Sequence, residues 1–183
     1  MYIKFYDSWP ENLPEHSFRL INFWKNLTKH NNQTIPPIEQ VLTATLQDGF
    51  EKNYLSESSG DDNLVILWSG LILDEFVGKD IAGKNIFDLM PPDVAELEKN
   101  FYSNLKNTPC GGLLVRSTLK QSGERLTYRT IQLPLADGAG NIRYFVGTGE
   151  VPKGINGEPV NFDLLSTEEF GYIDLGYGIP TDI

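Results

Sequence analysis

Few side chains in this sequence have the types and spacing that catalysis or metal binding requires. A nucleophile needs a positioned base beside it, and a metal ion needs several converging ligands. His16 and His30 stand near the two ends of one expected helix, with no acid or cysteine pattern around them, and we expect both to be solvated. The one cysteine, Cys110, lies in a Thr-Pro-Cys-Gly-Gly turn with no histidine nearby. The sequence therefore predicts no catalytic residue and no metal site.

Acidic pairs and glycine-rich segments offer little more chemistry. Neighbours along a chain point in different directions, so adjacent acids are expected to be solvated surface groups. The segment 137–141 lacks the terminal glutamate of an EF-hand loop, and the Gly-Lys-Ser/Thr of a phosphate loop occurs nowhere in the chain. A hairpin turn explains segment 137–141 better than a calcium or phosphate loop does. The acidic pairs are Asp61-Asp62, Asp74-Glu75 and Glu168-Glu169.

Composition narrows the class of protein. The chain has 183 residues, of which 40% are hydrophobic and 11% aromatic, which is typical of one globular domain with extensions. Its net charge is −10 and it has no basic cluster, whereas nucleic-acid binders present clustered Lys and Arg. We therefore expect no nucleic acid among its partners.

The sequence also bears on where in the cell the protein is found. A single cysteine excludes an internal disulfide. The first residues lack a basic stretch followed by an apolar core, so no signal peptide is expected. Every apolar run is shorter than the roughly 20 residues that a membrane helix requires, so no membrane insertion is expected. The sequence favours a cytoplasmic protein.

The central stretch Asn63 to Met90 is expected to organise the fold. An apolar run at 64–70 predicts a buried strand, and a short amphipathic piece after it ends at Gly78. A polar loop to Gly83 and a short helical piece to Met90 follow.

The N-terminal part predicts a helix over residues 12–29. Asn12 and Glu15 have the spacing of a capping box, and Pro14 suits a first turn. The apolar stripe of this helix must be covered, either by the protein's own domain or by a second copy or partner. Phe18, Ile21, Trp24 and Leu27 are the candidate interface residues.

Two more helices are expected. One begins at Pro36-Pro37 and ends at Gly49. The clearest helix in the chain begins at Pro91-Pro92 and ends before Pro109. Its apolar residues recur at helical spacing, and its charged residues are expected to point elsewhere. The inward set is Val94, Leu97, Phe101 and Leu105, and the outward set is Glu96, Glu98, Lys99 and Lys106.

Period-two patterns predict further strands at 50–57, 113–121, 125–136 and 142–151, the last three joined by short turns and therefore antiparallel. Three segments result: an N-terminal helical extension (1–49), a domain (50–151), and a C-terminal extension (152–183) that packs partly on the domain.

The run from His16 to Val151 resembles the PAS family found mostly in alphaproteobacteria, in which a PAS domain stands alone or nearly alone. The matching pieces are FRLINFWKNL, WSGLILDEFVGKDIAGKNIFDLM and LPLADGAGNIRYFVGTGEV. The resemblance implies an α+β fold: a PAS-like five-stranded antiparallel sheet with helices over one face. Pro36-Pro37-Ile38-Glu39 departs from the family, which usually has an arginine and more acids there, so no role is transferred to that segment.

The resemblance also implies a cavity between the sheet and its helices, for which a fully packed core is the alternative. An inward Arg116 or Arg129 would indicate an acidic ligand, because a buried arginine needs an anionic partner. No cysteine stands in the setting of a flavin-photochemical PAS domain and no histidine is placed as a haem ligand, so no cofactor is indicated. The candidate ligand-binding residues are Trp68, Phe76, Phe101, Arg116, Tyr128 and Phe145.

These observations favour a non-enzymatic sensory or signalling module that acts through a protein partner or as a homodimer. The alternative is a small-molecule sensor whose pocket is occupied. A third hypothesis, an enzyme on a cystatin-like scaffold, requires two or more carboxylates in the pocket.

Overall fold

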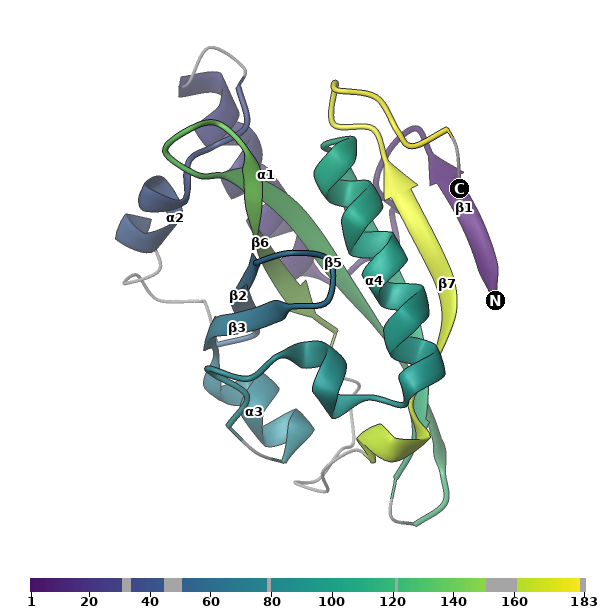
Figure 1. Ribbon diagram of the computed structural model, residues 1–183. Coiled ribbons are helices and arrows are strands. Elements are labelled where there is room, and N and C mark those ends of the chain that lie inside the picture. Colours follow the sequence, from purple (N-terminus) through teal and green to yellow (C-terminus); the bar gives the residue numbers. More distant parts are fainter. Residues whose placement is uncertain (31–33, 45–50, 79, 121, 151–160, 182–183) are drawn as a thin grey trace.

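The computed structural model describes residues 1–30, 34–44, 51–78, 80–120, 122–150 and 161–181. These residues form a seven-stranded sheet of order β1-β7-β4-β5-β6-β2-β3, with helices on both faces (Figure 1). The strands are β1 (Tyr2–Tyr6), β2 (Asn53–Ser58), β3 (Leu64–Ser69), β4 (Gly111–Leu119), β5 (Arg125–Ala136), β6 (Ile142–Gly149) and β7 (Ser166–Ile173).

The five expected strands are adjacent in this sheet. β4, β5, β6, β2 and β3 pair antiparallel in that order. The turn glycines Gly123 and Gly140 have φ of 82° and 86°, a left-handed conformation that glycine adopts without steric cost. The α+β class and the antiparallel sheet are therefore confirmed, with strand ends that differ by up to three residues from those expected.

Two strands extend the sheet beyond the expected five. β7 pairs antiparallel with β4, and β1 pairs parallel with β7, so the two ends of the chain lie side by side (Figure 1). Their partners are far away in sequence, and a local pattern carries no information about such pairing. Both strands come from the segments that flank the expected domain. The division of the chain at 49 and 151 stays a prediction.

The helices lie close to their expected positions: α1 (Glu15–His30), α2 (Ile38–Ala44), α3 (Leu71–Val77) and α4 (Pro92–Asn107), with 3₁₀ helices η1 (Ile86–Leu89) and η2 (Phe162–Leu164). Gly78 ends α3 with φ 74°, as expected. The expected end of the second helix, Gly49, lies outside the described residues. No helix in the described ranges is both long and apolar enough to span a membrane.

The expected capping box of α1 is wrong. The helix begins at Glu15, and the Asn12 side chain instead accepts a hydrogen bond of 2.9 Å from Arg129 of β5. His16 is half-buried rather than solvated, because its Nε2 donates to the Gly149 carbonyl of β6 at 3.1 Å. Both contacts fasten the start of α1 to the sheet.

The sheet itself covers the apolar stripe of α1. Ile21 and Trp24 are each 2% exposed, and Trp24 Nε1 donates a 2.8 Å hydrogen bond to the Pro134 carbonyl of β5. Phe18 and Leu27 are partly buried against the same cluster. Ile21 and Trp24 thus belong to the core of this chain, and a role of the stripe at an interface stays a prediction.

α4 crosses the opposite face of the sheet, where it lies in front of the strands in Figure 1. Its orientation reverses two expectations: Leu97 is 38% exposed, whereas Glu98 is fully buried. Positions 97 and 98 lie three and four residues after Val94, and helical spacing allows either to share its face. A buried carboxylate needs a partner, and the sheet supplies one.

We predict that Trp24→Ala lowers the free energy of unfolding by about 3–5 kcal/mol, because it removes a large buried side chain and its hydrogen bond. Phe5→Ala, at a side chain that is 51% exposed, is the matched control and should cost about 1 kcal/mol or less. Urea denaturation measures both. Equal stabilities of the two variants would contradict the assignment of Trp24 to the core.

Candidate functional site

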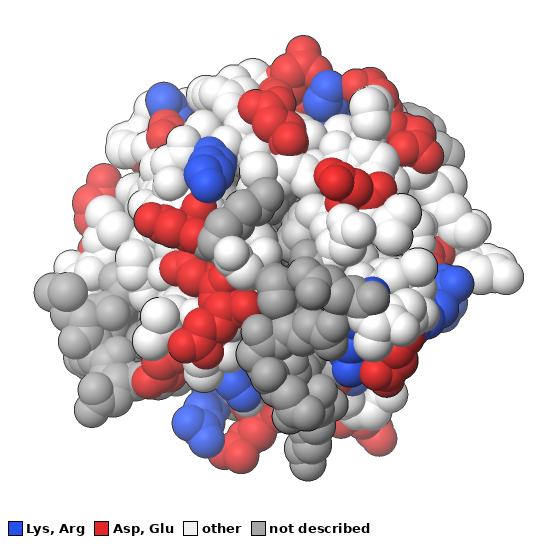
Figure 2. All heavy atoms as spheres, turned by 90° about the horizontal axis from the view of Figure 1, so that it is seen from below, with Lys and Arg blue, Asp and Glu red and all other residues white. Residues whose placement is uncertain are grey.

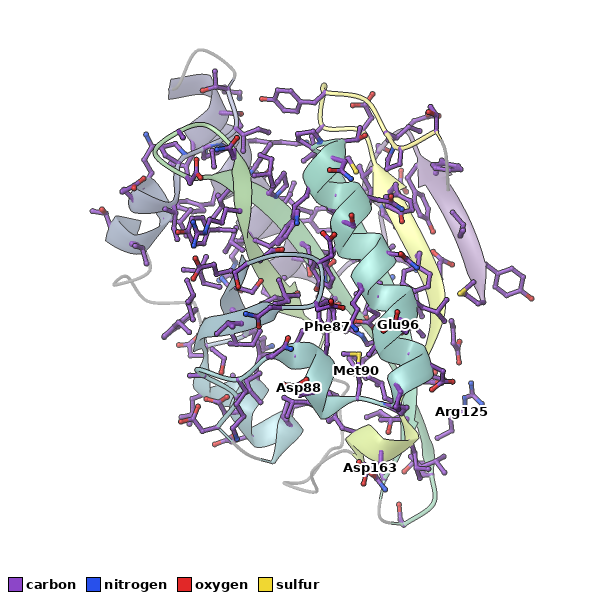
Figure 3. The ribbon with its side chains drawn as sticks, in the orientation of Figure 1. Phe87, Asp88, Met90, Glu96, Arg125 and Asp163 are labelled. Carbon is purple, nitrogen blue, oxygen red and sulfur yellow. The ribbon has the colours of Figure 1, made fainter. Side chains whose placement is uncertain are left out.

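A cavity of about 70 Å³ lies between the sheet and the layer formed by α3, η1 and η2. Figure 3 shows Met90, which lines it, between η1 and α4, and Asp163 on η2 below. Most of the wall is apolar, and the polar groups come chiefly from the sheet and α4. The apolar lining is Leu64, Ile66, Leu73, Phe76, Val77, Ile81, Ile86, Met90 and Phe162; the remainder is Tyr54, Tyr102, Arg116, Tyr128, Thr130, Gly149 and Glu150.

A buried ion pair stands at the polar wall. Arg116 of β4 points inward, and its Nε donates to Glu98 Oε1 of α4 at 2.7 Å, while Nη2 donates to Oε2. Arg116 Nη1 donates to Thr130 of β5 at 3.0 Å, and Thr167 of β7 donates to Glu98 Oε1 at 2.7 Å. The pair therefore joins α4 to three strands.

The hydrogen-bond network continues along the sheet. Gln132 Nε2 donates to Thr130 Oγ1 and to the Tyr54 hydroxyl, each at 2.9 Å. Tyr54 in turn interacts with the hydroxyl of Tyr102 on α4. Buried polar groups are costly unless they are paired, and this network satisfies most of them. Gln132 Oε1 is buried without a hydrogen-bond partner among the described residues.

Electrostatics keep Arg116 charged in this wall. Burial alone would lower the pKa of Arg116, but the Glu98 carboxylate outweighs it and holds that pKa well above its usual value. Burial raises the pKa values of Tyr54, Tyr102 and Tyr128, so all three phenols are protonated at neutral pH.

The Tyr128 hydroxyl is the open polar group of the cavity. The side chain is 4% exposed, and its ring meets Phe76 edge-on with 4.9 Å between the ring centres. No hydrogen bond joins its hydroxyl to another described residue. A bound molecule could therefore accept a hydrogen bond from this phenol or donate one to it.

The six candidate ligand-binding residues separate into distinct places. Phe76, Arg116 and Tyr128 line the cavity together. Phe145 is fully buried on the same side of the sheet and packs on Tyr102. Phe101 lies in a separate groove of about 320 Å³ between α4, β7 and β1. A role in binding stays a prediction for each of them.

Trp68 lies on the other face of the sheet, with the side chains that pack against α1. The cause is a bulge in β3: Trp68 is opposite Leu55, and Ile66 is opposite Ser56, so Leu67 is the extra residue. A bulge inverts the alternation of side chains along a strand. Ile66 therefore faces the cavity and Trp68 does not.

Glu98, Tyr54, Tyr102 and Thr130 were missing from the predicted site. A signal for Glu98 existed, because it stands four residues after Val94 and three before Phe101, on the buried stripe of α4. Tyr102 had the same signal, because it stands four residues after Glu98 on the buried stripe of α4. For Tyr54 and Thr130 no local signal existed, since the face that a strand residue occupies depends on register.

The remaining chemical candidates do not converge. Arg129 lies outside the cavity and pairs with Glu150 at 2.7 Å. Glu150 is the one carboxylate among the described lining residues, whereas the enzyme hypothesis needs at least two. Within the described ranges no three potential metal ligands cluster. Cys110 is buried and does not line the cavity.

We predict that Glu98→Gln destabilises the protein by about 3–5 kcal/mol, because it leaves the Arg116 charge buried without its counter-ion. The double variant with Arg116→Met removes both charges and should be less destabilised than the single variant. A double-mutant cycle by urea denaturation measures the coupling. Additive effects of the two changes would contradict a direct coupling.

We also predict that Cys110 reacts with iodoacetamide on the order of 10³-fold more slowly at pH 8 than an exposed thiol does. Burial, and secondarily the Asp174 charge, raises the pKa of Cys110 to about 12, so little thiolate exists below that pH. Reaction should accelerate as the pH rises toward 12. The urea-unfolded protein is the control, and equal rates at pH 8 would be the contrary result.

The sequence matches no protein-family model and no curated protein. Solved structures similar to it include the dark state of the Aureochrome1 LOV domain, a blue-light photoreceptor (19% identity, TM-score 0.43, 63% of this chain and 86% of that chain). Others are an RNA-binding light-oxygen-voltage receptor (14%, 0.44, 61% and 32%) and the Vibrio cholerae VqmA dimer (15%, 0.45, 63% and 52%). This chain thus spans about a third of the receptor and about half of VqmA. With these TM-scores the likeness assigns no function, and membership in the PAS family stays a prediction.

Proposed function

We propose that this protein is a non-enzymatic sensory module that binds a small molecule in its core cavity and reports the bound state to a protein partner. The observation that carries the proposal is the cavity itself: a mostly apolar space beside α3, η1 and η2, in which the Tyr128 hydroxyl makes no hydrogen bond to another described residue. Concave, mostly apolar pockets with few polar groups are the usual form of ligand sites.

The wall of the cavity supports a sensing role because its parts differ in how they are held. α4 is fixed by the Glu98–Arg116 pair. α3, in contrast, is only seven residues long, and its Asp74 accepts hydrogen bonds from the Ser69 hydroxyl and, at 3.4 Å, from the Ile81 N–H. A ligand that contacts Leu73, Phe76 and Val77 would therefore act on a short helix that no buried ion pair holds in the described structure.

A readout through protein contact suits a chain whose described cavity lining has a single carboxylate and no histidine or cysteine. The partner is either a second copy or a separate signalling protein. Ile21 and Trp24 of α1 pack against the sheet, so other exposed apolar residues are the better candidates for the contact surface. Exposed apolar residues are most closely spaced on β1, where Tyr2, Ile3 and Phe5 are 71%, 44% and 51% exposed.

We predict that freshly purified protein carries a bound compound in native mass spectrometry, or shows a thermal shift with a member of a metabolite panel. Ile66→Phe fills the cavity and should abolish both signals while the circular dichroism spectrum is retained. Ile3→Phe makes the same change on exposed β1 and is the matched control. If Ile66→Phe retains both signals, the ligand binds elsewhere. If the unmodified protein gives neither signal, the sensor proposal is contradicted.

A further inference from the structure

We infer that the cavity selects a neutral, compact, mostly apolar molecule with one hydrogen-bonding group, and rejects an anion despite its inward arginine. This inference rests on the proposed function and adds the chemical class of the ligand. It reverses the expectation that an inward Arg116 marks an acidic ligand.

The reason is that Arg116 already has its anion. Glu98, fully buried, accepts two hydrogen bonds from the guanidinium, and Thr130 accepts a third. Both carboxylate oxygens of Glu98 therefore accept a hydrogen bond from Arg116, and Oε1 accepts another from Thr167. An anionic ligand would add a second negative charge beside one positive charge, and a buried net charge is costly.

Glu150, the other charged residue of the lining, is paired as well. It forms an ion pair with Arg129, whose Nη1 also donates a hydrogen bond to the Asn12 side chain. The lining therefore has one positive and one negative side chain, each with a partner inside the chain. Neither an anion nor a cation finds an unmatched counter-charge in the described wall.

What remains available is the Tyr128 hydroxyl within an apolar surround. Phe76, Leu73 and Ile66 line the same space. A molecule with an apolar body and one amide, carbonyl or hydroxyl group satisfies the phenol and buries apolar surface at once.

The outer surface favours the same selection. Figure 2 views the molecule from the end that carries α3 and η2, both of which line the cavity. Asp and Glu side chains gather in a row across this face, with Lys and Arg toward its edges (Figure 2). With a net charge of −10, the protein repels an approaching anion at low ionic strength.

The volume limits the size of the ligand. A 150 Å³ apolar cavity holds benzene, and this cavity is about 70 Å³. This is about half of that volume, so we choose probes of four heavy atoms that differ in charge but not in shape: acetamide, which is neutral, and acetate, which is an anion. Titration of the full chain followed by two-dimensional NMR detects binding even at millimolar dissociation constants.

We expect acetamide to shift the resonances of Phe76 and Tyr128 in a saturable way, and acetate to bind at least about 10-fold more weakly. Tyr128→Phe removes the hydroxyl alone and should weaken acetamide binding about 5-fold to 10-fold. Tyr144→Phe, which makes the same change against the α1 side of the sheet, is the matched control and should leave binding unchanged.

The variant Glu98→Gln tests the reverse case, because it removes the carboxylate that pairs with Arg116. If the variant folds, acetate should bind at least about 10-fold better to it than to the unmodified protein. If it does not fold, the Tyr128→Phe comparison decides alone. Binding of acetate to the unmodified protein that equals or exceeds that of acetamide overturns the inference but leaves the cavity as a ligand site. Binding of neither probe overturns both the inference and the sensor proposal.

Discussion

The fold depends on one buried ion pair. Arg116 and Glu98 lie 18 residues apart on β4 and α4, and together with Thr130 and Thr167 they fix the helix across three neighbouring strands. A buried pair adds little net stability over an apolar one of equal volume, but a single unpaired member is strongly destabilising. We therefore see the pair as a device that sets where α4 lies on the sheet. The close approach also needs Gly112, since a Cβ there would lie 2.7 Å from atoms of Phe101 and Leu105.

The same pair shapes the chemistry of the cavity. The Arg116 guanidinium lies in the cavity wall, but Glu98 balances its charge. The wall therefore contains hydrogen-bonding groups without a net charge from this pair. Thr167 contributes from β7, a strand outside the expected domain. The C-terminal segment thus completes the polar wall as well as the sheet, and a truncation before β7 would leave Glu98 with one donor fewer.

Different helices pack on the two faces of the sheet. One face holds α1 and α2 over a closed cluster that includes Trp24 and Trp68, and the other holds α4 and the short helices around the cavity. Single residues decide which side chain belongs to which face. The bulge at Leu67 sends Trp68 to the α1 side, and one helical position separates exposed Leu97 from buried Glu98.

The sequence by itself determined five of the seven strands, the helices α1 to α4 with most of their ends, the antiparallel order of β4, β5 and β6, and the Gly78 stop of α3, because hydrophobic period and turn chemistry are local. It also named Phe76, Arg116 and Tyr128 as candidate lining residues, together with Trp68, but it left open which face of the sheet each strand residue occupies. Only the tertiary structure decided the pairing of β1 with β7, the partner of Arg116 and the face of Trp68. Each of these depends on register or on contacts between residues far apart in the chain, and a one-residue shift inverts the outcome. That is why an arginine that indicated an acidic ligand in the sequence is, in the folded chain, already neutralised by its own glutamate.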